Sequence, residues 1–171
     1  MKIRNSKTKK VALIGLSASL ALLLSYVEFL LPPLFVAVPG IKIGLPNVVI
    51  LYILYCLGTR YAALVSFVRI LISSILFGNM MTLAYSVAGA VLSLLVMTLL
   101  KKLNFMSSVG VSVAGGISHN IGQVLVATVL LDTPQIAYYL IVLAVTGIIS
   151  GTFIGLTSAY LIKRIPYSRI A

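Results

Sequence analysis

The chain has 171 residues, of which 61% are hydrophobic and 9% are charged, and its 13 Lys and Arg against 2 Asp and Glu give a formal net charge of +11. Soluble proteins carry roughly a quarter charged residues, so this composition excludes an ordinary globular enzyme, a disordered tail and a DNA-binding domain with a charged polar surface. The sequence therefore predicts a small integral membrane protein that folds as one domain.

Six apolar stretches predict six membrane-spanning helices, since about 20 helical residues cross a hydrocarbon core of ~30 Å. Their approximate ranges are 11–31, 43–58, 61–77, 80–100, 107–131 and 136–162. The first stretch follows a basic segment and resembles a secretory signal, but no small-residue cleavage pattern precedes Pro32, so we expect a retained helix. The expected fold is an all-α transmembrane bundle of six helices over 11–162, with basic tails over 1–10 and 163–171.

The positions of the cations predict the orientation of these spans. With the N-terminus inside, eleven of the thirteen basic residues fall on the cytoplasmic side: Lys2, Arg4, Lys7, Lys9, Lys10, Arg60, Lys101, Lys102, Lys163, Arg164 and Arg169. Lys and Arg concentrate in cytoplasmic loops, so we expect a multi-pass protein of the bacterial plasma membrane with both termini cytoplasmic. The strong basicity then reports topology and not a nucleic-acid partner.

The longest outer connection, Pro32 to Lys42, reads PPLFVAVPGIK. It is too apolar for a solvated loop, because a free loop of this length would expose its valine, leucine and phenylalanine side chains to water. We therefore expect it to fold back over the helix ends as a lid or plug.

Small residues at four-residue spacing mark helix faces on which backbones can approach closely in lipid. Three predicted spans carry such stripes: Ser17, Ala21 and Ser25 in the first, Gly110, Ala114, Ser118 and Gly122 in the fifth, and Gly147, Gly151 and Gly155 in the sixth. For the fifth and sixth spans we expect packing within the bundle. For the first span, docking of another membrane subunit is the alternative.

Polar and ionisable side chains inside a bilayer are costly unless they meet a partner or a cavity. At a rise of 1.5 Å per residue, Arg69 lies about 13 Å from the cytoplasmic end of its span, and His119 lies about 18 Å above Ser107. Other polar residues gather in the outer half as well: Glu28, Lys42, Asn47, Asn79, Asn120 and Gln123. This pattern predicts one cavity that opens to the outside and whose cationic balance suits an anionic or polar-headed ligand.

These residues also have structural alternatives. Arg69 can be neutralised by Glu28, and His119 can donate to a carbonyl group in the core. Solvation in a loop or capping of a helix end would explain three others: Lys42, Asn47 and Asn79. Their concentration in one half of the membrane favours a shared cavity over several independent structural roles.

Catalytic chemistry has few candidate residues in this chain. Glu28 and Asp132 are the only carboxylates, and with one histidine and one cysteine they leave zinc and magnesium sites short of ligands. No G-x-x-x-x-G-K-[ST] sequence occurs, so ATP would be used only through partner subunits. We therefore expect a chain without enzymatic activity and without a cofactor of its own.

Three segments resemble signature sequences of the bacterial Gx transporter family, often described as heptaprenyl diphosphate synthase component I: PGIKIGLPNVVILYILYCLG (39–58), FVRILISSILFG (67–78) and SSVGVSVAGGISHNIGQVLVA (107–127). That family in turn resembles the substrate-binding S components of energy-coupling factor (ECF) transporters. The resemblance implies a six-helix protein that binds a vitamin-like compound on the outer side and docks onto a membrane coupling subunit driven by two cytoplasmic ATPases. It also implies that Ser17 and Ala21 of the first helix face the coupling subunit.

Two function classes follow. The first is a substrate-binding subunit for uptake of a small anionic or polar-headed vitamin- or precursor-like compound, energised by partner ATPases. The alternative is a membrane subunit of a quinone- or isoprenoid-related or flavin-based electron-transfer assembly. Synthase activity is not expected. Prenyl diphosphate synthases need two Asp-rich motifs to hold magnesium, and this chain contains one aspartate.

Overall fold

The computed structural model describes residues 2–31, 44–132, 138 and 140–165. Six α-helices lie in these ranges: α1 (Lys2–Leu30), α2 (Asn47–Cys56), α3 (Thr59–Phe77), α4 (Met80–Leu103), α5 (Ser108–Leu131) and α6 (Leu140–Arg164). All except α2 contain an apolar stretch long enough to cross a membrane. The predicted all-α class with six helices is confirmed, and the chain is a multi-pass membrane protein.

The second helix is shorter than the predicted range 43–58. It has 10 residues, which at 1.5 Å per residue give about 15 Å, half the thickness of the hydrocarbon core. A turn through Gly44 and Pro46 precedes it, and Gly58 follows it with a φ of 99°. The apolar stretch is thus longer than the helix, because part of it is used to reverse the chain direction.

The larger apolar core is built around α2. The buried residues of this helix run without a break over Val48–Leu54, so all of its faces are covered. It packs against α1, α3 and α6, and Ala21, Val65 and Ile154 bring buried side chains from these three helices. A helix that is apolar on every face needs such enclosure, which explains how a helix too short to cross a membrane is held inside the bundle.

Side chains from neighbouring helices bond to the backbone of α2 and of α6. The Ser158 hydroxyl donates to the Val48 carbonyl at 3.0 Å, and Lys101 Nζ donates to the Leu54 carbonyl at 2.6 Å. Carbonyl groups in the last turn of a helix lack partners within the helix, so the second bond satisfies one of them. The Tyr52 hydroxyl donates to the Ile165 carbonyl at 2.8 Å. The Lys101 and Tyr52 bonds connect α2 to the C-terminal ends of α4 and α6, and the Ser158 bond joins α6 to the beginning of α2.

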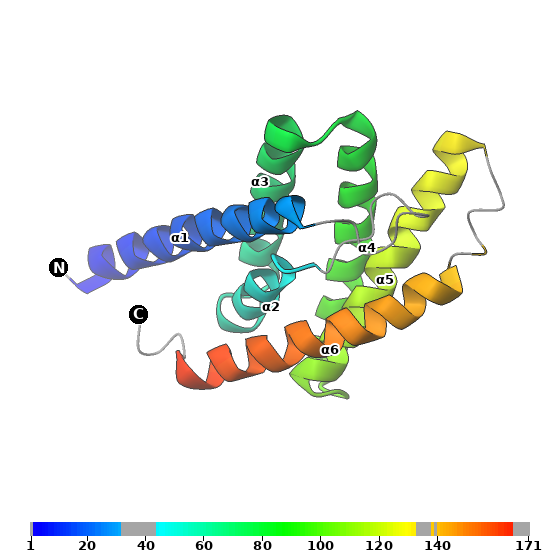
Figure 1. Cartoon of the computed structure of the whole chain (residues 1–171). Helices are drawn as coiled ribbons and strands as arrows, with labels where there is room; N and C mark the ends of the chain where they lie inside the picture. Colours follow the sequence, from blue (N-terminus) through cyan, green and yellow to red (C-terminus); the bar gives the residue numbers. More distant parts are fainter. Residues whose placement is uncertain (1, 32–43, 133–137, 139, 166–171) are drawn as a thin grey trace.

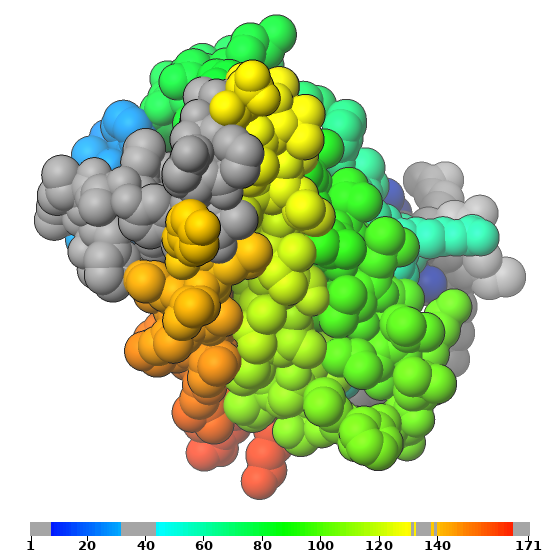
Figure 2. All heavy atoms as spheres, turned by 90° about the vertical axis from the view of Figure 1, so that its right-hand side faces the viewer, coloured from blue at the N-terminus to red at the C-terminus, as the bar shows by residue number. Residues whose placement is uncertain are grey.

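Helix α5 runs between α4 and α6, as Figure 2 shows on one face of the molecule. Three glycines of α6 at four-residue spacing face α5 at close range: Gly147, Gly151 and Gly155. A Cβ atom added at Gly151 would lie 2.7 Å from Val113 Cα, and one added at Gly122 of α5 would lie 2.7 Å from the Ala88 carbonyl oxygen of α4. The expectation that small residues of the fifth and sixth spans pack within the bundle is therefore confirmed at these positions.

Figure 1 shows α3, α4 and α5 as an antiparallel series, with α1 and α6 running across it in opposite directions. The beginning of α1 and the end of α6 lie on the same side of the molecule. Basic residues stand at the start of α3 and in the last turns of α4 and α6: Arg60, Lys101, Lys102, Lys163 and Arg164. This grouping agrees with the predicted topology, whereas the side of the membrane on which these residues lie stays a prediction.

The small residues of α1 that were expected to dock a partner subunit instead face this chain. Ser17 is 5% exposed and Ala21 is 0% exposed, and Ala21 belongs to the core around α2. Small residues allow close helix contact with any neighbour, and here the neighbours are α2 and α3. The expectation of an open docking surface at Ser17 and Ala21 is corrected accordingly: the exposed face of α1 carries larger residues such as Leu16 and Leu20.

Candidate functional site

A cavity of about 240 Å³ lies where all six helices meet. Gly78 and Thr82, at the turn between α3 and α4, line it, whereas Arg60 and Lys101 stand at the other ends of these two helices. The cavity is therefore in the half of the bundle opposite the basic residues. Its polar lining residues are Ser25, Glu28, Asn47, Arg69, Ser73, Ser74, Thr82, Ser86, His119, Asn120, Gln123 and Ser150.

The structure brings six of the eight predicted binding residues to this cavity: Glu28, Asn47, Arg69, His119, Asn120 and Gln123. Lys42 and the predicted lid lie outside the described residues. The role of the six residues in binding a ligand stays a prediction. A shared ligand site requires that they line one cavity, and they do so from four helices.

Asn79, the eighth predicted residue, caps α4. Its side-chain oxygen accepts a hydrogen bond from the Thr82 backbone N–H at 2.9 Å, and its own backbone N–H donates to the Thr82 hydroxyl at 2.8 Å. This reciprocal pair is a capping box, which satisfies N–H groups that the first turn of a helix leaves without partners. Asn79 does not line the cavity, so the structure favours the capping alternative for this residue.

Arg69 supplies the cation of the cavity. Its Nε atom is buried and has no hydrogen-bond partner among the described residues. Glu28 lines the same cavity from α1 and attracts the guanidinium electrostatically. A guanidinium carries five N–H donors in a fixed fork, and a buried donor without an acceptor costs free energy. An oxygen atom of a ligand would supply the acceptor that Nε lacks.

Glu28 is also joined to the segment that precedes α2. Its carboxylate accepts a hydrogen bond from the Gly44 backbone N–H. Gly44 has a φ of 82°, and a Cβ atom added there would lie 2.9 Å from Asn47 Nδ2. Glycine at this position is required by both the backbone conformation and the narrow space beside Asn47. The Gly44 turn therefore positions Glu28 and Asn47 on one wall of the cavity.

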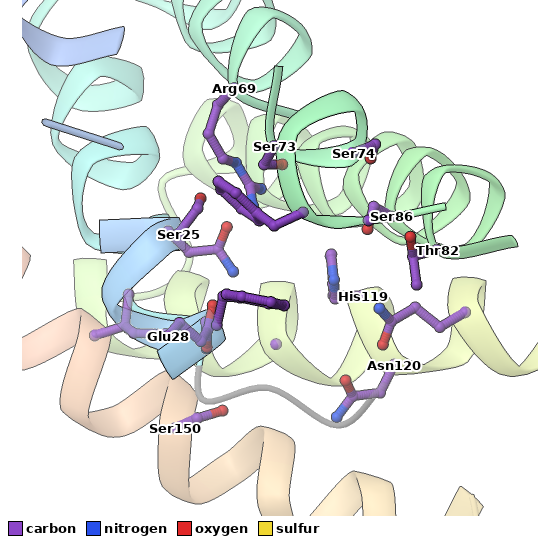
Figure 3. Close-up of a pocket in the computed structure, with 18 residues that line it drawn as sticks. Ser25, Glu28, Arg69, Ser73, Ser74, Thr82, Ser86, His119, Asn120 and Ser150 are labelled. Atoms are coloured by element: carbon purple, nitrogen blue, oxygen red, sulfur yellow. The ribbon is translucent and has the colours of Figure 1, made fainter. Parts of the chain in front are cut away.

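The His119 side chain packs against α4 on one side, and its ring lines the cavity on the other. It hydrogen-bonds with the backbone of Gly89, and a Cβ atom added at Gly89 would lie 2.9 Å from the ring atoms Cε1 and Nδ1. Arg69 and His119 extend from α3 and α5 toward the same space (Figure 3). The backbone contact predicted as the structural alternative for His119 is present, and it leaves the ring on the cavity wall.

Asn120 combines a structural contact with a place in the lining. Its Nδ2 donates to the Leu143 carbonyl of α6 at 2.6 Å. This bond uses an N–H donor of the side-chain amide, so the amide oxygen is still able to accept a hydrogen bond. Asn120 therefore links α5 to α6 at the same level as the cavity.

Sequence reasoning missed the hydroxyl residues of the lining, of which Ser25 was interpreted only as a packing residue. A signal was present, because polar residues four positions apart share one helix face, and two such pairs bring hydroxyls to the cavity: Arg69 and Ser73, Thr82 and Ser86. It was overlooked because serine in an apolar helix usually bonds to its own backbone. Ser25 does so, donating to the Ala21 carbonyl at 2.9 Å.

The described lining combines opposite charges with neutral hydrogen-bonding groups, so the predicted cationic balance is not present among the described residues; Lys42 lies outside them. The lining offers one guanidinium, one carboxylate, one imidazole, amides and several hydroxyls. Phe29 and Phe77, whose ring centroids are 5.2 Å apart, form an apolar part of the wall where α1 meets α3. Pockets for drug-sized ligands measure about 300–1,000 Å³, so the volume of this cavity favours a smaller molecule.

A family model described as heptaprenyl diphosphate synthase component I matches residues 16–161. The searches for similar curated proteins and for similar solved structures found no match. The matched range contains every residue of the cavity lining. The description names a component, which implies a multi-subunit assembly.

Proposed function

The chain belongs to the heptaprenyl diphosphate synthase component I family of Gx- and ECF S-component-like membrane proteins, and from this premise we propose that it is a substrate-binding subunit for uptake. Its ligand is a small anionic or polar-headed compound, related to a vitamin or a biosynthetic precursor. A membrane coupling subunit and a cytoplasmic ATPase pair supply the energy. The chain itself binds without catalysing a reaction.

The observation that carries this proposal is the buried Nε of Arg69 in a polar cavity. Burying a charged donor without an acceptor costs free energy. In a binding site this cost is removed when the ligand binds, because the ligand supplies the acceptor. The second support is position. If the basic ends of the helices are cytoplasmic, the cavity lies in the outer half of the membrane, where an uptake protein must capture its ligand.

Native mass spectrometry of the protein purified from its own membrane tests the proposal. We expect a bound small molecule on the wild type and its loss in R69M, because the substitution removes the cation that holds the ligand head. R60M is the matched control: Arg60 lies on the same helix, is exposed and is remote from the cavity. Its ligand occupancy should equal that of the wild type.

A structural role of Arg69 predicts a different result. Removing one partner of a buried ion pair costs about 3 kcal/mol or more, so R69M would then unfold at a lower temperature than R60M while any surviving protein kept its ligand. Retention of the same bound mass by both R69M and H119A would contradict the proposed binding site.

The family description favours a second candidate, a membrane subunit of an isoprenoid- or quinone-related assembly. The single aspartate of the chain argues against synthase activity of its own, so this role would depend on a catalytic partner. Co-purification under mild detergent separates the candidates. Recovery of a coupling subunit with two ATPases supports uptake, whereas recovery of prenyl-synthase or flavin-bearing proteins without ATPases supports the second candidate.

A further inference from the structure

A second cavity, of about 430 Å³, lies at the opposite end of the bundle from the Arg69 cavity. It is an open cavity, lined by the end of α2, the end of α4, the beginning of α5 and the last turns of α6. Its lining residues are Tyr55, Lys101, Asn104, Met106, Ser108, Ala159, Ile162 and Lys163. We refer to these eight residues as the basic pocket.

Two ammonium groups from different helices line the basic pocket. Lys101 stands in the last turn of α4 and Lys163 in the last turn of α6. Lys101 is held in place, because its Nζ donates to the Leu54 carbonyl at 2.6 Å and lies 5.0 Å from the centroid of the Tyr55 ring. A lysine has three N–H donors, so this bond to Leu54 leaves further donors for a ligand.

In the part of the chain that the structure describes, neither acidic side chain lies beside the two lysines. The only acidic residues are Glu28 and Asp132. Glu28 lines the other cavity. Asp132 follows the far end of α5, whose 24 residues separate it from Ser108 of the basic pocket by about 36 Å. An anion that approaches the basic pocket therefore meets no opposing acidic side chain among the described residues.

The beginning of α5 adds to the attraction for an anion. Ser108 is the first residue of this helix and lines the basic pocket. The first N–H groups of a helix form the positive end of the helix dipole, which favours phosphate and other anions. In α5 one of these groups, the Gly110 N–H, already donates to the Ser107 hydroxyl at 3.2 Å, so an anion would be attracted by the dipole and the remaining N–H groups. Two lysines and a helix N-terminus thus converge on one cavity.

Apolar residues beside the basic pocket indicate where the anion comes from. Leu103, the last residue of α4, and Phe105, in the connection to α5, are exposed, and so is Met106 of the pocket itself. In a membrane protein such residues contact acyl chains, and basic pockets between helix ends are suited to anionic lipid head groups. We propose that the basic pocket binds the phosphate of an anionic phospholipid, with the acyl chains lying against Leu103 and Phe105.

Thermal unfolding of the purified full chain in a neutral detergent tests the proposal. Phosphatidylglycerol should raise the melting temperature, and phosphatidylcholine should not. In K163Q the apparent affinity for phosphatidylglycerol should fall about fivefold, which corresponds to about 1 kcal/mol for a lysine near the surface. K102Q is the control, because Lys102 is an exposed lysine in the last turn of α4, next to Lys101, and does not line the pocket.

K163R, which keeps the positive charge, should retain most of the response to phosphatidylglycerol. K101Q would also remove the bond to Leu54, so K163Q, which leaves that bond intact, decides the test. Because the Arg69 cavity is remote from the basic pocket, R69M should respond to phosphatidylglycerol as the wild type does, whatever the outcome for the proposed function.

Three results would overturn the proposal. One is an equal response of K163Q and K102Q. Another is stabilisation by inorganic phosphate to the same degree as by phosphatidylglycerol, which would keep a phosphate site but reject a lipid as its source. The third is the absence of any lipid response together with loss of a co-purified protein from K163Q, which would identify the basic pocket as a protein contact.

Discussion

Gly44 organises both a turn and one wall of the Arg69 cavity. Its backbone N–H donates to Glu28, its φ of 82° suits glycine, and the space beside it is occupied by Asn47. The same residue therefore forms the turn before α2 and positions two polar side chains of the cavity. Gly58 has a similar φ of 99° but has no other atom within 4 Å of an added Cβ.

The two glycines provide a matched pair of substitutions. G44A and G58A should each lower the free energy of unfolding by about 1 kcal/mol, because alanine is strained at positive φ. Only G44A should also lose ligand, since its Cβ would displace Asn47 and disturb the bond to Glu28. Occupancy by native mass spectrometry and melting temperature measure the two effects separately. Equal occupancy in G44A and G58A would show that the Gly44 turn has no part in binding.

Asn79 differs from the six predicted residues that line the cavity, because it lies outside the lining and its side-chain oxygen caps α4. We expect N79A to lower the stability of the protein by about 1 kcal/mol, as loss of an N-cap usually does, without changing ligand occupancy. N79S should restore stability, because serine is also a good N-cap residue. Reduced ligand occupancy in a stable N79S protein would return Asn79 to the binding site.

At the scale of helices, α5 is the element on which the fold and the site both depend. It presents His119 and Asn120 to the cavity while packing closely against α4 and α6. Glycines on both sides allow this, since helices in lipid associate through close contact and not by excluding water. A change in the distance between α5 and α6 would therefore alter packing and cavity shape together.

Gly151 tests this coupling. A Cβ atom in G151A would lie 2.7 Å from Val113 Cα, a backbone atom that cannot rotate away. Overpacking of this kind costs about 1–3 kcal/mol, so the melting temperature should fall clearly. T152A is the control, because Thr152 donates only to the Ile148 carbonyl of its own helix. Unfolding of G151A at the temperature of T152A would mean that α5 and α6 are not closely packed at this point.

At the scale of the whole molecule, the two cavities and the cations divide the bundle into two ends. The Arg69 cavity lies near the α3–α4 turn, and the basic pocket lies near the last turns of α4 and α6. This difference between the two ends is compatible with the proposed uptake role, in which the ligand binds at one side of the membrane and the basic surface lies at the other. It also makes the orientation of the chain in the membrane directly testable.

Cysteine labelling in a C56S background checks the orientation, since Cys56 is the only native cysteine. A membrane-impermeant thiol reagent should label D132C from outside the cell and should label K102C only after the membrane is opened. These positions stand at opposite ends of the bundle, after α5 and at the end of α4. Labelling of D132C from the cytoplasmic side only would reverse the proposed topology and place the Arg69 cavity inside.

Membrane class and the presence of six helices followed from the sequence alone, whereas the depths of Arg69 and His119 in the membrane stay predictions. Hydrophobicity, charge distribution and a rise of 1.5 Å per residue are local properties that need no knowledge of neighbours. The same calculation of positions along the helices also predicted that the polar residues gather in one half of the bundle. The hydroxyls were missed because a serine that bonds to its own helix has the same sequence signal whether it lines a cavity or faces lipid.

Tertiary structure alone decided which helix faces meet. It turned Ser17 and Ala21 toward α2 and α3, limited α2 to 10 residues and brought Glu28, Arg69 and His119 together from three helices. In lipid, the rotation of a helix depends on close packing against its neighbours more than on an apolar stripe, because nearly every face of a spanning helix is apolar. The spacing of residues along one helix therefore cannot specify its partner, whereas the packed bundle does.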